Sequence, residues 1–219
     1  MYSYYMKILF LSFFTLFFAS SPSLAAISTS ANTLSVSAEN GHKFPLNWKE
    51  YSTSDPRWSI RYPRGWRIMP NNEIEATGIK VDGALQRKYP IQSYAPFIVI
   101  NHEKLKNALS PQEYSNAARK SVQSLRDYKL LSLEVIHTQD GEHSLHVFTA
   151  KSDDSNLLPG YFYQVYTVID ETGFVVTAYI PNRSFSKELD TIIRRMLSSI
   201  YFRTLNITKM QVKIGRAHV

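Results

Sequence analysis

The sequence predicts an α+β domain: an α/β/α sandwich with a mostly antiparallel sheet covered by helices. Three observations predict this class. The stretch from Trp58 to Trp66 has the pattern of a strand followed by a tight turn, two pairs of strand-like runs are joined by turn signals, and two segments have helical apolar spacing. Strands joined by short turns pair antiparallel, and amphipathic helices bury their apolar face on such a sheet.

The first 25 residues are expected to be a signal peptide. Lys7 precedes an apolar run from Ile8 to Phe18, and small residues follow up to a cleavage point after Ala25. A membrane anchor is the alternative, but the run is shorter than the roughly 20 residues that a spanning helix needs. The sequence has no cysteine, which excludes a lipoprotein anchor, disulfides and thiolate chemistry.

The other boundaries follow from composition. Residues 26–43 are expected to be a flexible leader, 44–203 the folded domain and 204–219 a tail. Residues 213–219 read KIGRAHV, a translated sequencing adapter, and are expected to be an artefact. Without both ends, 22 basic residues remain of 25 against 18 acidic ones, so the net charge falls from +7 to +4. This excess does not indicate nucleic-acid binding.

Two strands are expected at the start of the domain. The first lies within Phe44–Tyr51, at a sheet edge, because Pro45 has no N–H to donate. The second runs from Trp58 to Tyr62, where apolar and polar residues alternate as in a half-buried strand. Pro63 ends this strand, and Trp66 follows as a large anchor for the core.

The next segment, Asn71 to Pro96, has no clear periodicity. We expect a long, exposed excursion here, with a short strand around Ile79 and Val81. Phe97–Ile100 is a short continuous apolar run, which is typical of a buried strand.

A helix is predicted after Ser110. Ser110 can cap it, Pro111 suits its first position and Glu113 can complete a capping box. Apolar residues then recur at helical spacing: Tyr114, Ala117, Ala118, Val122 and Leu125.

Asp140-Gly141 predicts a hairpin between Leu130–Thr138 and His143–Ala150. With a two-residue turn, His137 and His146 become diagonal neighbours on one face. Two histidines can begin a metal site, but closed zinc sites have four ligands. We find no third ligand, so His137 and His146 stay weak candidates, and no metal or cofactor is expected.

A second hairpin is expected from Gly160–Ile169 and Phe174–Ile180 around the turn Asp170–Gly173. The last helix is expected over Ser186–Ile200. Its apolar face consists of Phe185, Leu189, Ile192, Ile193, Met196 and Ile200, while Arg194 and Arg195 are expected to face outward.

These segments together resemble the PsbP-like superfamily, which includes DcrB-type periplasmic proteins and a Ran-binding protein. The resemblance rests on Trp58–Trp66, Ser110–Tyr114, Gly141 in its hairpin and Thr191–Phe202, and covers roughly Phe44 to Phe202. It implies an α/β/α sandwich and a binding or accessory role without known catalysis.

Four arginines are the candidate binding residues: Arg57, Arg61, Arg64 and Arg67. They alternate with large aromatic residues, so they can form a basic surface for an anionic partner. The alternative is that the aromatic residues are core and the arginines a solvated face.

No set of residues forms a catalytic constellation. The sequence has no GxSxG elbow and no phosphate-binding glycine loop, and the acid pairs Asp153-Asp154 and Asp170-Glu171 are typical of turns. We therefore expect a periplasmic or secreted non-catalytic binding or accessory protein without a membrane span after signal cleavage. Its partner is expected to be an envelope protein or envelope component, not nucleic acid. A small-ligand carrier, with a cleft beside residues 71–96, and an unrecognised hydrolase are the alternatives.

Overall fold

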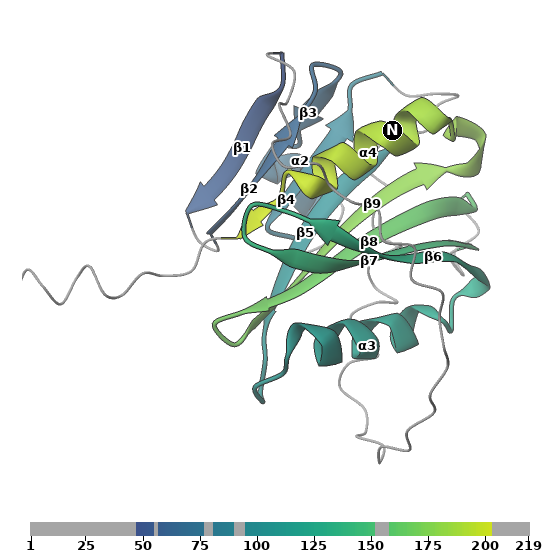
Figure 1. Cartoon of the computed structure of the whole chain (residues 1–219). Helices are drawn as coiled ribbons and strands as arrows, with labels where there is room; N and C mark the ends of the chain where they lie inside the picture. Colours follow the sequence, from purple (N-terminus) through teal and green to yellow (C-terminus); the bar gives the residue numbers. More distant parts are fainter. Residues whose placement is uncertain (1–46, 55–56, 77–80, 90–94, 152–157, 203–219) are drawn as a thin grey trace, which may run out of the picture.

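The computed structural model describes residues 47–54, 57–76, 81–89, 95–151 and 158–202. The expected signal peptide, leader and tail, and the pair Asp153-Asp154, lie outside these ranges. A large sheet forms the middle layer, with helix α4 (Lys187–Ser198) on one face and helix α3 (Pro111–Val122) on the other (Figure 1). The predicted α/β/α arrangement is confirmed. Within the described ranges, no helix has the length and apolarity needed to span a bilayer.

The large sheet has seven strands, and all its neighbouring strands pair antiparallel. The two hairpins predicted from turn signals form four of its strands. In spatial order the strands are β3 (Trp66–Ile68), β4 (Gly83–Arg87), β5 (Phe97–Lys104), β9 (Thr172–Pro181), β8 (Gly160–Ile169), β7 (Glu142–Lys151) and β6 (Arg126–His137).

A second, three-stranded sheet consists of β1 (Lys49–Ser54), β2 (Arg57–Tyr62) and β10 (Tyr201–Phe202), in the order β1-β2-β10. The strand predicted at Trp58–Tyr62 is β2, and it ends where Pro63 follows. The Trp66 N–H donates to the Pro63 carbonyl at 3.0 Å, which closes the predicted turn. Trp66 is 3% exposed and belongs to the core as expected.

The segment Asn71–Pro96 differs from the prediction of an exposed excursion. It contains helix α2 (Asn71–Ala76) and strand β4, whose first three residues are buried in the large sheet. Of the strand predicted near Ile79 and Val81, Ile79 lies outside the described ranges, and Val81 precedes β4, which begins at Gly83. Elements of five or six residues are too short to show periodicity, so the sequence pattern missed them.

Helix α3 begins as predicted. The Ser110 Oγ accepts from the Glu113 N–H at 3.2 Å, and the Glu113 carboxylate accepts from the Ser110 N–H at 2.9 Å. Helix α4 is capped in a similar way, because the Ser186 Oγ accepts from the Leu189 N–H at 3.1 Å. A short 3₁₀ turn, η1 (Asn182–Ser184), connects β9 to α4.

The core lies on both faces of the large sheet. On the α4 face, apolar residues of the large sheet pack against α4 and the small sheet; examples are Trp58, Ile60, Leu85, Ile98, Val176, Ile193 and Met196. On the α3 face, helix and sheet bury Tyr114, Ala118, Val122, Phe148, Phe162 and Tyr166. The α3 face also buries polar residues, and the candidate site is built from them.

Candidate functional site

A row of polar side chains crosses the large sheet on the α3 face. The register pairs His146 on β7 with Gln164 on β8, and Gln164 with Thr177 on β9. These three residues are buried, and His146 is only 1% exposed. Buried polar groups need hydrogen-bond partners, because their lost contacts with water are otherwise not replaced. The row therefore has to be connected internally.

Hydrogen bonds join the row into one directional chain. The Gln164 Nε2 donates to the Thr177 Oγ1 at 3.1 Å, and the Tyr166 hydroxyl donates to the Gln164 Oε1. The His146 Nδ1 lies 3.5 Å from the Tyr166 oxygen, and its Nε2 lies 3.0 Å from the Tyr128 oxygen. Since Tyr166 already donates to Gln164, His146 donates through Nδ1 and accepts from Tyr128 through Nε2.

The electrostatics of the row keep its members neutral. Burial, helped by the positive charge of Arg119, lowers the pKa of His146 to about 4. Burial also raises the pKa of Tyr166 and of Tyr128 above the usual tyrosine value. Near neutral pH the row thus consists of a neutral imidazole and protonated phenols. Its hydrogen bonds fix which atom carries each proton, and these groups carry no charge.

The four predicted arginines lie on different elements and have different contacts. Arg57 and Arg61 lie on β2 in the small sheet, Arg64 follows β2, and Arg67 lies on β3 in the large sheet. Arg61 pairs with Glu50 at 3.4 Å. Arg57 and Arg64 are exposed at opposite ends of β2.

Arg67 is held by a carboxylate. It donates to both carboxylate oxygens of Glu73 at 2.9 and 2.7 Å and to the Gln86 side chain at 2.9 Å. The hydrogen bond from Arg67 lowers the pKa of Glu73. These hydrogen bonds join α2 to β3 and β4, so the Arg67 guanidinium has a structural role.

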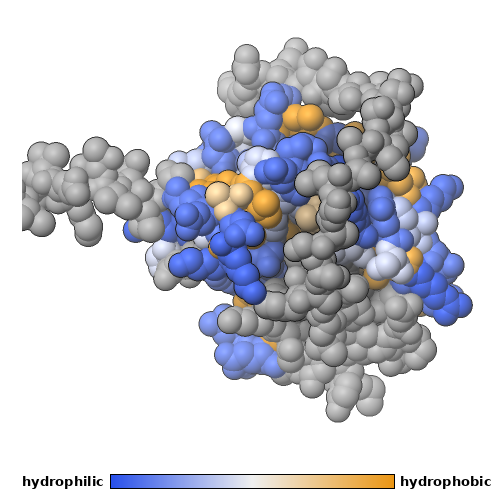
Figure 2. Space-filling view, turned by 90° about the horizontal axis from the view of Figure 1, so that it is seen from below, coloured by the Kyte–Doolittle hydropathy of each residue, from blue (hydrophilic) through white to orange (hydrophobic). Residues whose placement is uncertain are grey.

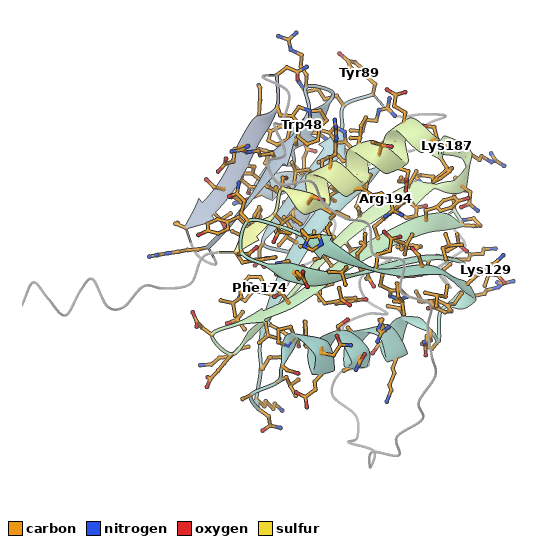
Figure 3. All side chains as sticks on the ribbon, viewed as in Figure 1. Trp48, Tyr89, Lys129, Phe174, Lys187 and Arg194 are labelled. Atoms are coloured by element: carbon orange, nitrogen blue, oxygen red, sulfur yellow. The ribbon has the colours of Figure 1, made fainter. Side chains whose placement is uncertain are left out.

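Arg194 does not face outward as predicted. Its Nη1 donates to Glu134 on β6 at 2.6 Å, its Nε donates to Asp190 at 3.1 Å, and its guanidinium lies over the ring of Tyr163. Figure 3 labels Arg194 beneath α4, toward the sheet. The helical apolar pattern is wide enough to bring this arginine to the margin of the buried face, where its long side chain reaches the strands.

The predicted neighbourhood of His137 and His146 is wrong. The register pairs His137 with Glu142 and Leu133 with His146, because four residues rather than two form the loop. His137 therefore lies about 13 Å along the strands from His146, next to Glu142 at 3.3 Å. No cluster of three or more metal-ligating side chains occurs among the described residues.

A second histidine contact was not predicted. The His143 Nε2 lies 3.2 Å from the Asp140 Oδ1, and the Asp140 Oδ2 accepts from the Phe202 N–H at 3.1 Å. Burial alone would raise the pKa of Asp140, but the hydrogen bonds from His143, Thr138 and Phe202 outweigh it and lower that pKa. The Thr138 hydroxyl also donates to Asp140. Because the Asp140 carboxylate accepts from the Phe202 N–H as well, it joins the β6–β7 hairpin to β10.

Strand β6 forms one edge of the large sheet. It is 12 residues long and pairs only with β7 among the strands that the structure describes. Leu130, Leu131 and Val135 on this strand are 45%, 43% and 39% exposed. The register is interrupted near Leu130, and it is regular from Ser132 to His137. An edge strand with exposed apolar side chains can pair with another extended segment.

The sequence reasoning missed most of the polar row. Gln164 and Thr177 interrupt otherwise apolar strands, which is a signal of buried polar residues, but their partners depend on a register that no single strand specifies. The contribution of Tyr128 to the row was also not predicted. On the α3 side, hydrophilic side chains dominate the described surface, and apolar atoms form separate patches (Figure 2).

Comparison with solved structures supports the fold. No protein-family model and no curated protein matches the chain. Among solved structures, cyanobacterial PsbP from Synechocystis is 10% identical, with a TM-score of 0.50, over 76% of this chain and 98% of that one. PA94 from Pseudomonas aeruginosa, a protein of unknown function, is 9% identical, with a TM-score of 0.50, over 73% and 99%. The Ran-binding protein Mog1p of Saccharomyces cerevisiae is 8% identical, with a TM-score of 0.48, over 73% and 97%. The likenesses to PsbP and PA94 concern the fold alone.

Proposed function

We propose that this chain, which has the PsbP-like fold, is an exported, non-catalytic binding protein of the cell envelope. Its partner in this proposal is another envelope protein, which adds an extended segment along β6. The amino-terminal pattern of charge, apolar run and small residues supports export. The fold itself is compatible with many functions, so the proposal depends on the surface of this chain.

The observation that carries the proposal is the edge of β6. Regular pairing with β7 holds Ser132–His137 extended. Main-chain groups on the other side of this segment can form a ladder with a partner strand, and exposed Leu131 and Val135 can pack on that strand's side chains. Figure 3 labels Lys129 at this edge, well away from Tyr89.

A non-catalytic role agrees with the contacts of the buried histidines. His146 is enclosed by Tyr128 and Tyr166, and His143 contacts the carboxylate that holds the Phe202 N–H. Both therefore connect elements of the fold.

The arginines give a second candidate surface, with Arg57 and Arg64 as its exposed members. Their separation along β2 favours β6 as the main contact, because a strong anionic contact uses convergent guanidinium groups.

The test is crosslinking and pull-down from the native envelope with tagged full-length protein. We expect the recovered protein to begin at Ala26 and to capture a partner that a Leu131→Lys, Val135→Lys variant fails to capture. Lysine at these positions removes apolar contact and adds charge at the edge. Tyr89→Lys is the matched control, since Tyr89 is an exposed apolar residue outside β6.

Three outcomes would contradict parts of the proposal. Equal capture by the β6 variant and wild type removes β6 as the binding edge. Loss of capture by an Arg57→Glu, Arg64→Glu variant alone assigns the contact to the small sheet. Recovery of protein that retains residues 1–25 in the membrane fraction supports the membrane anchor instead of cleaved export.

A further inference from the structure

The first half of β6 turns almost all of its side chains to solvent. Five of its first six residues are exposed, although a strand on a packed sheet normally turns every second side chain inward. The register with β7 is interrupted twice here, between Arg126 and Lys129 and between Leu130 and Ser132, and Asp127 has a φ of 55°. Bulges of this kind bend a strand and change the direction of its side chains. The bulged segment, residues 126–131, therefore presents consecutive side chains at the surface.

Two leucines lie next to each other in the bulged segment. Leu130 is 45% exposed and Leu131 is 43% exposed, and no other described leucine, isoleucine or valine is as exposed. In a regular strand, neighbouring residues point to opposite faces, so one of the two would be turned toward the core. Adjacent exposed apolar side chains with polar groups around them are typical of an interaction site.

Cations without ion pairs lie beside the two leucines. Arg126 and Lys129 are exposed, and Arg126 lies directly opposite Lys151 on β7. Like charges in opposite positions on neighbouring strands repel each other. None of the ion pairs within the described residues includes Arg126, Lys129 or Lys151. Figure 3 labels Lys129 at the outer margin of the molecule, so its charge can meet an anionic partner.

A bilayer surface with anionic lipids matches this combination of groups. Leucine side chains enter the boundary between headgroups and acyl chains. Lysine and arginine keep their charged ends at the lipid phosphates while their stems lie against apolar surroundings. A partner strand matches the bulged segment less well, because a ladder needs main-chain groups at regular spacing and a bulge interrupts that spacing.

We propose that the bulged segment attaches the protein to the surface of a membrane that contains anionic lipids. Leu130 and Leu131 enter the bilayer interface, and Arg126 and Lys129 contact lipid phosphates. The contact is peripheral and reversible, because it uses two leucines and a few charges. This inference goes beyond the proposed function, because it concerns lipid and leaves Ser132–His137 available to a partner strand.

The experiment is co-sedimentation of tagged protein, recovered from the native envelope, with vesicles of phosphatidylglycerol and phosphatidylcholine in equal parts. We expect binding that weakens when the salt concentration rises from about 0.1 M to about 1 M, because the Debye length then falls from about 10 Å to about 3 Å. Vesicles of phosphatidylcholine alone should bind the protein at least about tenfold more weakly, since they lack the negative surface charge.

A charge variant tests the two exposed cations. Arg126→Gln, Lys129→Gln should bind the anionic vesicles about 25-fold more weakly, because each basic residue near such a surface contributes about fivefold in affinity. Lys49→Gln, Lys104→Gln is the matched control. It removes the same charge from exposed positions on β1 and β5, and it should bind within about twofold of the wild type, since distant charges are screened.

A label and a second variant test the leucines. The sequence has no cysteine, so Leu130→Cys can carry a single polarity-sensitive dye. Its emission should shift to the blue when anionic vesicles are added, and the same dye on Lys104→Cys should not shift. Leu130→Ser, Leu131→Ser should bind about tenfold more weakly, because two partly exposed apolar side chains no longer leave water. Far-UV circular dichroism checks that each variant is folded.

Several results would overturn this proposal. An absence of binding to both kinds of vesicle assigns the bulged segment to an acidic protein surface instead. Equal binding by the wild type and the charge variant assigns the membrane contact to another segment, such as residues 1–25. A dye on Leu130→Cys that does not shift removes the leucines from the contact. The vesicles contain no protein, so these results are independent of the pull-down that tests the partner strand along β6.

Discussion

A histidine with 1% of its surface exposed has to find partners for both ring nitrogens inside the protein. His146 finds them in Tyr128 and Tyr166, which come from different strands. The cost of charging the ring in this setting is large, because an imidazolium would face two hydroxyl groups and the nearby cation Arg119. Through His146, the unfolding free energy of the protein therefore depends on pH.

We predict that His146 makes the protein less stable as the pH falls from about 6.5 to about 4. Its folded pKa, about 4, is below the unfolded value of about 6.5, so in this window the unfolded state binds more protons. The unfolding free energy should then drop by about 1.4 kcal/mol per pH unit, and by at most about 3.4 kcal/mol in all. Urea unfolding at a series of pH values measures this slope.

The matched variants for this prediction are His146→Gln and His137→Gln. Glutamine at position 146 removes the titrating group, so the slope should flatten. His137 lies at the surface beside Glu142, and its replacement should leave the slope in place. A slope that survives in His146→Gln would mean that another group causes it.

Residue patterns could predict some of these environments and not others. The capping box at Ser110 and the buried position of Trp66 were predicted, because a cap and a large aromatic after a strand are local signals. The chain from Tyr128 to Thr177 was not, since its partners lie on four different strands. Arg194 was placed outward for the same reason: Glu134, its partner, is 60 residues away.

At the scale of elements, the two hairpins differ from the prediction in loop length: the loop at Asp140-Gly141 is longer than predicted, and the turn at Asp170–Gly173 is shorter. The predicted two-residue turn at Asp140-Gly141 is part of a four-residue loop, closed by the Thr138 N–H donating to the Gly141 carbonyl at 2.8 Å. The β8–β9 hairpin has the two-residue turn instead, at Asp170 and Glu171, with φ of 47° and 62°. Both residues occupy a conformation that side chains with a Cβ disfavour.

We predict that Glu171→Gly stabilises the protein by about 0.5–1 kcal/mol. Glycine adopts positive φ without steric cost, and this gain outweighs its extra freedom in the unfolded chain. The Glu171 carbonyl accepts from the Leu105 N–H, and glycine keeps that contact. Urea unfolding measures the change.

Glu171→Ala is the control, because alanine keeps the Cβ and should not stabilise. If alanine and glycine have the same effect, the backbone conformation is not the source of the gain, and loss of the glutamate side chain is.

At the scale of the whole molecule, the two sheets meet at Trp58 and Gly83. A Cβ on Gly83 would lie 2.6 Å from the Trp58 ring, and Trp58 also makes an edge-to-face contact with Tyr51 at 5.1 Å. The glycine on β4 thus lets the tryptophan ring of β2 approach the backbone of the large sheet closely. The sequence pattern placed Trp58 in a half-buried strand, but it placed Gly83 in an exposed segment. The sequence does not show which ring packs against a glycine, because that contact depends on how the two sheets pack.

We predict that Gly83→Ala destabilises the protein by about 1–3 kcal/mol, because a buried tryptophan ring and two backbones must move to admit one methyl group. Gly65→Ala is the matched control: nothing lies within 4 Å of its added Cβ, so the change should stay within about 0.5 kcal/mol. Chemical denaturation of both variants beside the wild type measures the difference. Equal stability of the two variants would mean that the sheets separate at this point at little cost.

The pairing of β10 with β2 sets the order in which the molecule can be completed. Tyr201 lies opposite Ser59 and Phe202 opposite Trp58, and the Phe202 N–H is held by Asp140. A nascent chain reaches Trp58 long before residue 202 has been synthesised, so the small sheet stays open until the whole domain has left the ribosome. Such a late, long-range closure slows folding. Until then, one edge of β2 lacks its partner strand, and its main-chain groups are open to pairing with other chains.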